Sequence, residues 1–270
     1  MTVIVDNKAD NGLSGEWGLS ILIEKDDVRV LLDTGGSDLF AANMEKLGLD
    51  IADVDYAVLS HAHYDHSLGM RKFFESNSKA GFYLRESAAE NCYARKLIFK
   101  KYIGIPKHIT EEFADRIKYV SGDYRLCDGM YLIPHKTPGL EKIGLREKML
   151  VRKGRKWQSD DFSHEQSLVV ETSKGLVIFN SCSHGGAVNI INEIQNTFPD
   201  KHIYGLVGGL HLFNKTAEEI TAVAEGIRDT GIEYVLTGHC TGNRAYCILK
   251  EVLGNRLDML KVGLVRQFGN

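Results

Sequence analysis

The sequence contains no long apolar run and few cysteines. No stretch of about 18 apolar residues is present, and residues 1–8 lack a basic region followed by an apolar core. Neither a membrane span nor a signal peptide is therefore expected, and we predict a cytoplasmic protein. The five cysteines are odd in number and form no Cys-x-x-Cys pair, which favours reduced thiols over a disulfide framework.

An excess of charge of one sign is also missing. The 33 basic and 36 acidic residues give a formal net charge of −3, so no global field would attract a nucleic acid or an anionic membrane. We therefore expect neither as a partner. The glycine-rich segments match neither the dinucleotide nor the P-loop spacing, and no Gly-x-Ser-x-Gly elbow occurs. The sequence thus implies no nucleotide cofactor and no serine nucleophile.

Apolar periodicity predicts a chain in which strands alternate with helices, and the order of strand, histidine-containing polar loop and helix recurs in both halves. The predicted strands span residues 2–5, 18–24, 28–33, 56–60, 167–172, 176–180, 203–208, 234–237 and 257–267. The predicted helices span 38–47, 187–197 and 244–253, with others starting near Ser67 and after the capping box Thr216-x-x-Glu219.

No linker rich in proline, glycine or serine separates the two halves. We therefore predict one domain over residues 1–270, built from two β-rich sheets flanked by helices. The stretch 71–161 has a less regular pattern, with predicted helices at 87–96 and 111–118. It is interpreted as an insertion or a lid.

The residues with the clearest chemistry form the run His61-Ala62-His63-Tyr64-Asp65-His66, which directly follows the predicted strand 56–60. Neutral imidazole and carboxylate are ligands that zinc, iron and manganese take from proteins. His61 and His63 can aim at one metal, while Asp65 and His66 turn toward a second. A chance cluster of solvated histidines is the alternative.

This His-x-His-x-Asp-His pattern after a buried strand resembles the signature of the metallo-β-lactamase superfamily. The resemblance implies an α/β fold, a four-layer αββα sandwich. It further implies that His61 and His63 bind a first metal, and that Asp65 and His66 bind a second. The segment Leu31-Leu32-Asp33-Thr34-Gly35-Gly36 resembles the superfamily's early element, in which the aspartate, here Asp33, supports the metal loop.

The later ligands are identified by the same resemblance. His239, in Thr237-Gly238-His239-Cys240-Thr241-Gly242, ends a predicted strand and resembles the last ligand of the second metal. Where the superfamily has a bridging aspartate, this chain has Ser181-Cys182-Ser183-His184. The patterns Cys-Ser-His-Gly-Gly, Gly-Gly-Leu-His-Leu and His-Cys-Thr-Gly are similar to a subgroup named after an aryl ribofuranosyl-phosphate dihydropterin synthase.

Four residues near the site keep open roles. His184 is preferred over His164 as the third ligand of the first metal, although His164 precedes a strand, as the superfamily's third histidine does. Cys182 is either a thiolate ligand in place of the missing carboxylate or a small buried side chain. His211 is a metal neighbour, a substrate contact or a structural loop residue.

The resemblance predicts a metal-dependent hydrolase, or a related transferase, with one or two zinc ions, or iron or manganese. A hydroxide between two metals would be the nucleophile because coordination lowers the pKa of water to about 7. Asp65 would orient it and take its proton. The substrate is expected to be a small, possibly phosphorylated molecule. The basic run from Lys142 to Lys156, followed by Trp157, is either a solvated face or a phosphate-binding surface.

Two alternatives come from other functional classes. The missing bridging aspartate favours a metal-containing binding or effector protein with little or no turnover. A nuclease or phosphodiesterase is the other alternative, and the acidic balance of the chain counts against it. Neither the substrate nor the oligomeric state follows from the sequence.

Overall fold

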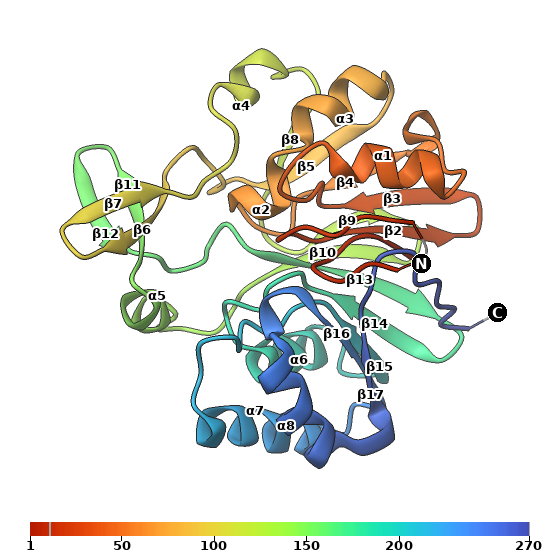
Figure 1. Cartoon of the computed structure of the whole chain (residues 1–270), viewed down its shortest axis with the longest axis vertical. Helices are drawn as coiled ribbons and strands as arrows, with labels where there is room; N and C mark the ends of the chain where they lie inside the picture. The colour runs from red at the N-terminus through yellow and green to blue at the C-terminus, as the bar shows by residue number, and fades with distance from the viewer. Residues whose placement is uncertain (11, 270) are drawn as a thin grey trace.

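Two β-sheets face each other at the centre of the fold in the computed structural model, which describes residues 1–10 and 12–269 (Figure 1). The first sheet has the strand order β1-β2-β3-β4-β5-β8, and the second has the order β17-β16-β15-β14-β13-β10-β9. The strands of the first sheet are β1 (Thr2–Val5), β2 (Ser20–Lys25), β3 (Val28–Leu32), β4 (Tyr56–Val58), β5 (Gly81–Arg85) and β8 (Ile117–Val120). Those of the second are β9 (Tyr124–Cys127), β10 (Met130–Pro134), β13 (Gln166–Thr172), β14 (Gly175–Phe179), β15 (Ile203–Val207), β16 (Tyr234–Thr237) and β17 (Leu257–Met259).

Helices cover the outer faces of both sheets. In Figure 1, α1 and α3 lie over the first sheet, and α6, α7 and α8 lie over the second. The helices are α1 (Leu39–Lys46), α2 (Tyr64–Ser67), α3 (Met70–Ser76), α4 (Ile109–Glu112), α5 (Glu141–Glu147), α6 (Ala187–Thr197), α7 (Ala217–Asp229) and α8 (Asn243–Leu253), with short 3-10 turns at Ile51–Asp53, His239–Thr241 and Gly254–Arg256. This arrangement confirms the predicted αββα sandwich. In the part of the chain that the structure describes, no helix is long and apolar enough to cross a membrane.

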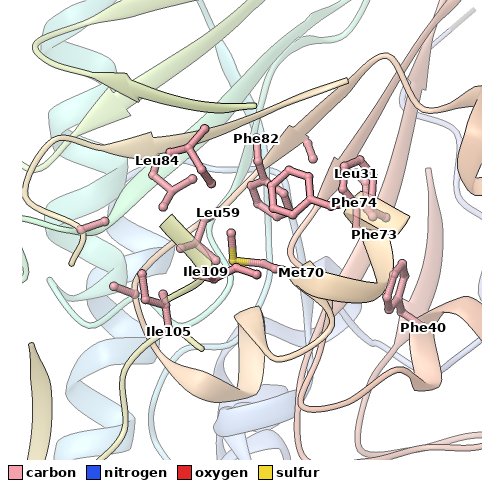
Figure 2. Packing of buried hydrophobic residues seen from close by; sticks show 14 of the residues in the cluster. Leu31, Phe40, Leu59, Met70, Phe73, Phe74, Phe82, Leu84, Ile105 and Ile109 are labelled. Atoms are coloured by element: carbon pink, nitrogen blue, oxygen red, sulfur yellow. The ribbon is translucent and has the colours of Figure 1, made fainter. Parts of the chain in front are cut away.

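Three apolar clusters fill the three interfaces between these four layers. Phe40, Met70 and Phe73 join α1 and α3 to the first sheet, where Phe82 packs edge-to-face against Phe73 (Figure 2). A second cluster lies between the sheets, and a third lies under α6, α7 and α8. Because strand side chains alternate, Leu31 enters the first cluster while its neighbour Leu32 enters the one between the sheets.

Burial of both strand faces explains why the strands are nearly continuous apolar runs. Each fully buried leucine or isoleucine in these layers contributes about 1.5–3 kcal/mol. The ends of the helices follow local chemistry. Thr216 begins α7, as predicted: its hydroxyl accepts a hydrogen bond from the Glu219 amide at 3.3 Å, and the Glu219 carboxylate accepts one from the Thr216 amide at 2.9 Å.

The stretch 71–161 divides between the central sheets and a separate small sheet. Its strands β5, β8, β9 and β10 belong to the two central sheets. A separate four-stranded sheet with the order β12-β11-β6-β7 stands at one end of the molecule (Figure 1). Its strands are β6 (Cys92–Lys96), β7 (Phe99–Tyr102), β11 (Met149–Lys153) and β12 (Lys156–Ser159). Only these strands stand apart as an insertion would, and their role as a lid stays a prediction.

Three predicted elements are wrong in type or length. The predicted helix 87–96 is not helical: residues 87–91 form turns and loop, and residues 92–96 are a strand because they pair with both β7 and β11. The predicted helix 111–118 is helical only to Glu112, since Ile117 already pairs with β5. The predicted strand 257–267 ends at Met259, because the chain then turns back to the N-terminal strand, where Leu264 accepts a hydrogen bond from the Val3 amide.

Candidate metal centre

The predicted site residues lie on loops at one edge of the two sheets. The run from His61 to His66 follows β4 and leads into α2. Cys182 and His184 follow β14, and His239 follows β16. Because β14, β15 and β16 are parallel, their carboxyl ends meet at the same edge of the sheet. The sheet topology therefore brings together side chains that are up to 178 positions apart in the sequence.

The first group of candidate ligands consists of His61, His63 and His184. Their ring centroids are 4.6–4.9 Å apart, and all three rings are buried. The Nε2 atoms of His61 and His63 and both ring nitrogens of His184 are buried without a hydrogen-bond partner. Burial lowers the pKa of His63 to about 3 and holds the pKa of His61 and His184 well below the ordinary value. These neutral imidazoles with unused lone pairs fit a divalent cation.

The second group consists of Asp65, His66 and His239. The Nε2 atoms of His66 and His239 are 3.2 Å apart, and Asp65 Oδ2 lies 3.5 Å from His239 Nε2 and 3.9 Å from His66 Nε2. Burial acts to raise the pKa of Asp65, but the neighbouring histidines outweigh it and hold the pKa below the ordinary range. Cys182 Sγ lies 3.2 Å from His66 Nε2, on the same side of the group.

Asp33 supports both groups from a fully buried position. Its Oδ2 lies 2.8 Å from His66 Nδ1 and accepts a hydrogen bond from the Ser60 hydroxyl at 2.6 Å. The same hydroxyl lies 2.8 Å from His61 Nδ1, and Asp33 Oδ1 accepts from the Ser60 amide. One carboxylate therefore orients a histidine of each group and leaves its Nε2 free for a metal.

Sequence reasoning missed three residues that complete the site from the N-terminal segment. Asn7 Oδ1 lies 3.1 Å from His239 Nδ1, and Asp6 accepts a hydrogen bond from the His239 amide. The Trp17 indole donates to Asp65 Oδ2 at 2.8 Å. Asp6 and Asn7 directly follow the predicted strand 2–5, and this position was the available signal. It did not indicate which loop these two residues contact.

Comparison with known proteins decides the family. The profile of the metallo-beta-lactamase superfamily matches residues 18–178. The chain belongs to the metallo-β-lactamase superfamily. A solved superfamily structure, Tm1679, described as a metal-dependent hydrolase, is 31% identical, covers 100% of this chain and 98% of its own, and has a TM-score of 0.84.

A curated relative from Methanocaldococcus jannaschii is 26% identical and is named 7,8-dihydropterin-6-methyl-4-(beta-D-ribofuranosyl)-aminobenzene-5'-phosphate synthase. The match covers 94% of this chain and 90% of the relative. The predicted resemblance to the superfamily and to this subgroup is thus confirmed. A diphosphatase of the PhnP family, 14% identical with a TM-score of 0.59, covers 99% of this chain and 96% of its own, and it shares the fold.

Within this superfamily fold, His164 and His184 differ in what their ring nitrogens contact. His164 Nδ1 accepts a hydrogen bond from the Ala62 amide at 3.1 Å, and its Nε2 lies 3.1 Å from Asp160 Oδ2. Both nitrogens of His164 therefore have partners within the protein, and Nδ1 holds the loop 61–66. His184 keeps both of its nitrogens unpaired and stacks on Phe162 with a centroid distance of 5.0 Å.

A buried ion cluster, also missed from the sequence, lies beneath His184. His135 Nε2 is 2.7 Å from Glu165 Oε2, and His135 Nδ1 is 3.0 Å from Glu193 Oε2. Glu165 also accepts hydrogen bonds from the amides of His184 and Gly185, both at 3.1 Å. Gly185 passes so close to His135 that a Cβ there would lie 2.2 Å from Cε1. The cluster thus fixes the loop that carries His184.

This cluster should make the folded protein less stable as the pH rises into the alkaline range. Burial alone would lower the pKa of His135, but Glu165 and Glu193 outweigh it and raise the pKa from 6.5 to about 10. The stabilisation is therefore complete below pH 6.5 and is lost as the pH rises through about 10. We expect the free energy of unfolding to fall by about 3–5 kcal/mol across this window, measured by urea denaturation with a chelator present.

The control for this prediction is His135→Gln, which cannot lose a proton. The variant should be less stable than the wild type at pH 6, and the difference should shrink toward pH 10. Parallel curves for the two proteins would show that the cluster does not hold an extra proton in the folded state.

A cavity of about 290 Å³ opens over the candidate metal centre. Its floor includes His63, Asp65 and His184. The separate four-stranded sheet forms one wall of the cavity through Ala94, Lys96, Lys101 and Met149. The remaining sides include Trp17, His211 and Phe213. The basic run from Lys142 to Lys156 lies on α5, β11 and β12. A phosphate-binding surface was one interpretation of this run, but its charged side chains do not line this cavity.

Proposed function

We propose that the protein is a metal-dependent enzyme that hydrolyses, or transfers a group of, a small phosphorylated molecule. The observation that carries this proposal is the convergence of two groups of buried donors at one sheet edge, beneath an open cavity. Buried polar atoms without partners are rare in folded proteins and call for an unseen partner. Unpaired imidazole nitrogens make a divalent cation the partner that fits best.

His61, His63 and His184 would hold a first ion, and Asp65, His66 and His239 a second. Zinc suits this donor set best, and iron and manganese accept the same ligands. Cys182 would replace the bridging carboxylate as a thiolate, since its Sγ lies among the donors of the second group. A bound divalent ion would act as a Lewis acid toward the substrate and lower the pKa of water.

The chain's own residues then have defined tasks. Asp65 stays ionised at neutral pH because its pKa is held low, and the Trp17 indole fixes the direction of its carboxylate. That arrangement suits an orienting carboxylate at the cavity floor. Trp17 and Phe213 form an edge-to-face pair, with centroids 5.6 Å apart, that gives one side of the cavity an aromatic wall.

Either hydrolysis or transfer is compatible with this site. The relative from Methanocaldococcus jannaschii is named a synthase, whereas the similar solved structure is described as a hydrolase. The fold supports many reactions, so the class of reaction has to come from experiment. The second candidate function is a metal-containing binding protein with little turnover. The position of Cys182 supports it, because a thiol in place of a bridging carboxylate would bind the second ion through a different kind of ligand.

The test of the proposal is the metal content of protein purified without chelator or nickel, followed by a screen of phosphoesters, diphosphates and lactones. We expect one to two equivalents of zinc, iron or manganese and turnover that a chelator abolishes. Metal without turnover, with substrate-like molecules raising Tm, would favour the binding protein. Absence of metal after reloading would contradict the whole assignment.

Two lysines indicate where a phosphate would bind. Lys96 and Lys101 share the face of the β6–β7 hairpin that lines the cavity, because Lys101 pairs with Ala94, two residues from Lys96. In the described residues, 1–10 and 12–269, neither ammonium group has a carboxylate partner. Lys101 Nζ lies 5.7 Å from the centroid of the Tyr64 ring at the cavity floor.

We expect Lys96→Ala with Lys101→Ala to raise the KM of a phosphorylated substrate about tenfold or more, with a smaller change in kcat. The matched control is Arg95→Ala with Lys100→Ala, a cross-strand pair on the opposite face of the same hairpin. Steady-state kinetics at low and high salt measure the effect. Equal KM values for the two double variants would show that general surface charge, rather than these lysines, attracts the substrate.

A further inference from the structure

A second cavity, of about 250 Å³, lies beside the metal-side cavity. It is enclosed by α5, α7 and the loops that follow β14 and β15, and it shares His184 and His211 with the first cavity. Ile143, Leu212 and Val223 contribute much of its apolar lining. Its volume is below the range of about 300–1,000 Å³ typical of whole-ligand pockets, so it suits one ring-sized part of a ligand.

Polar atoms without partners lie in this apolar surround. Ser183 Oγ and His211 Nδ1 are buried without hydrogen bonds, and both residues line the cavity. His184 adds a third such atom, because a metal would take only one of its two unpaired nitrogens. Three of the other candidate ligands have partners for their far nitrogens: Ser60 for His61, Asp33 for His66 and Asn7 for His239.

The backbone that presents these atoms is strained. Ser183 and His211 have φ angles of 48° and 50°, in the left-handed region that residues other than glycine seldom adopt. Asn180 Oδ1 holds Ser183 by accepting its amide proton at 2.7 Å, and Cys240 Sγ accepts that of His211 at 3.3 Å. Strain that the surroundings enforce is concentrated at ligand-binding positions in proteins.

The charges at this cavity are paired with each other. The side chain of Glu147 is only 4% exposed and forms ion pairs with Lys215 and Arg146. Arg146 also lies 3.8 Å from Glu219. No unpaired charge therefore faces the cavity from the described lining residues, in contrast to Lys96 and Lys101 on the metal side. Paired charges around an apolar surface select against a charged ligand.

We propose that this second cavity binds an uncharged, mainly apolar ring of the substrate that carries hydrogen-bonding atoms. Ser183, His211 and the far nitrogen of His184 anchor the ring. The metal centre then lies between an anion-binding side and an uncharged side, which suits a reaction that joins or splits two unlike halves. This inference rests on the proposed function for the position of the reacting bond, but binding of the ring alone is testable without turnover.

The experiment uses zinc-loaded protein and two probes of the same shape. Isoquinolin-1-one is an uncharged bicyclic lactam with a donor and an acceptor, and naphthalene has neither. Methyl NMR spectra should show the signals of Leu210, Leu212 and Val223 shifting with the lactam and much less with naphthalene. Ser183→Ala should weaken lactam binding about three- to tenfold, as expected for one lost hydrogen bond.

Ala222→Phe adds a ring at the exposed rim of the cavity, where Ala222 is one of the lining residues. This variant should abolish the shifts and keep the zinc content of the wild type. Glu225→Phe is the control, since Glu225 is exposed on the same helix and does not line the cavity. The inference is overturned if the lactam gives no shifts, binds the Ala222→Phe variant equally well, or binds no better than naphthalene. If the wild-type protein retained no zinc after loading but still bound the lactam, the proposed metal function would be contradicted and the proposed ring-binding cavity would not.

Discussion

His184→Ala is expected to remove the metal ion from the first position, whereas His164→Ala is expected to keep it. Both histidines are buried near His61 and His63, so the two substitutions make similar cavities. They differ in their nitrogens: those of His164 contact Ala62 and Asp160, and those of His184 have no hydrogen-bond partner among the described residues. Loss of a ligand from a three-nitrogen site should leave the ion too weakly bound to survive gel filtration.

Elemental analysis of both variants after zinc loading measures the difference. We expect His184→Ala to lose about one equivalent relative to the wild type and all detectable turnover, and His164→Ala to retain the metal content of the wild type with reduced thermal stability. Loss of the metal from His164→Ala alone would reverse the assignment of the third ligand. Loss of the metal from both variants would mean that neither ring alone determines metal binding. Retention of the metal in both would mean that His184 is not a ligand.

Asp33→Asn is expected to weaken binding of both ions at once, by about 10- to 100-fold each. Asp33 accepts hydrogen bonds from Ser60 and lies against His66, so it orients one histidine of each group. An amide keeps the size of the carboxylate but presents one acceptor and one donor in place of two acceptors. Competition with a zinc-binding dye would report the two dissociation constants.

Asp160→Asn is the matched control for Asp33→Asn. Asp160 is also a fully buried carboxylate next to a histidine, but that histidine is His164. The control should lower Tm and leave the metal affinity within about threefold of the wild type, since stability effects of buried polar groups need not reach the site. An equal loss of affinity in both variants would show that Asp33 has no special orienting role.

The sequence was sufficient to predict the layers and the position of the metal loop. Strands buried on both faces are continuous apolar runs, and helices such as 187–197 have one apolar face, so both are visible without a structure. The run from His61 to His66 is local, so its spacing alone placed four candidate donors together. His239 could be placed as well, because the loop that follows its predicted strand resembles the superfamily's segment for the last ligand.

Residues whose role depends on distant contacts were not predictable in the same way. Asp6 and Asn7 reach His239 across more than 230 positions, and nothing in their own segment names that partner. His135 becomes a support of His184 only because Glu165 and Glu193 come from other elements. For β6, pairing with two neighbouring strands outweighed a local pattern that favoured a helix.

The candidate ligands come from both sheets, and under the proposed function this division would couple the supply of metal to the lifetime of the folded protein. His61, His63, Asp65 and His66 extend from the first sheet, and His184 and His239 from the second. An ion bound by ligands from both sheets must dissociate before the sheets can separate. When the free ion concentration is 1,000 times the dissociation constant, binding adds about 4 kcal/mol to the free energy of unfolding. Under metal starvation the two sheets would separate at this edge more often, and proteases would degrade the chain sooner.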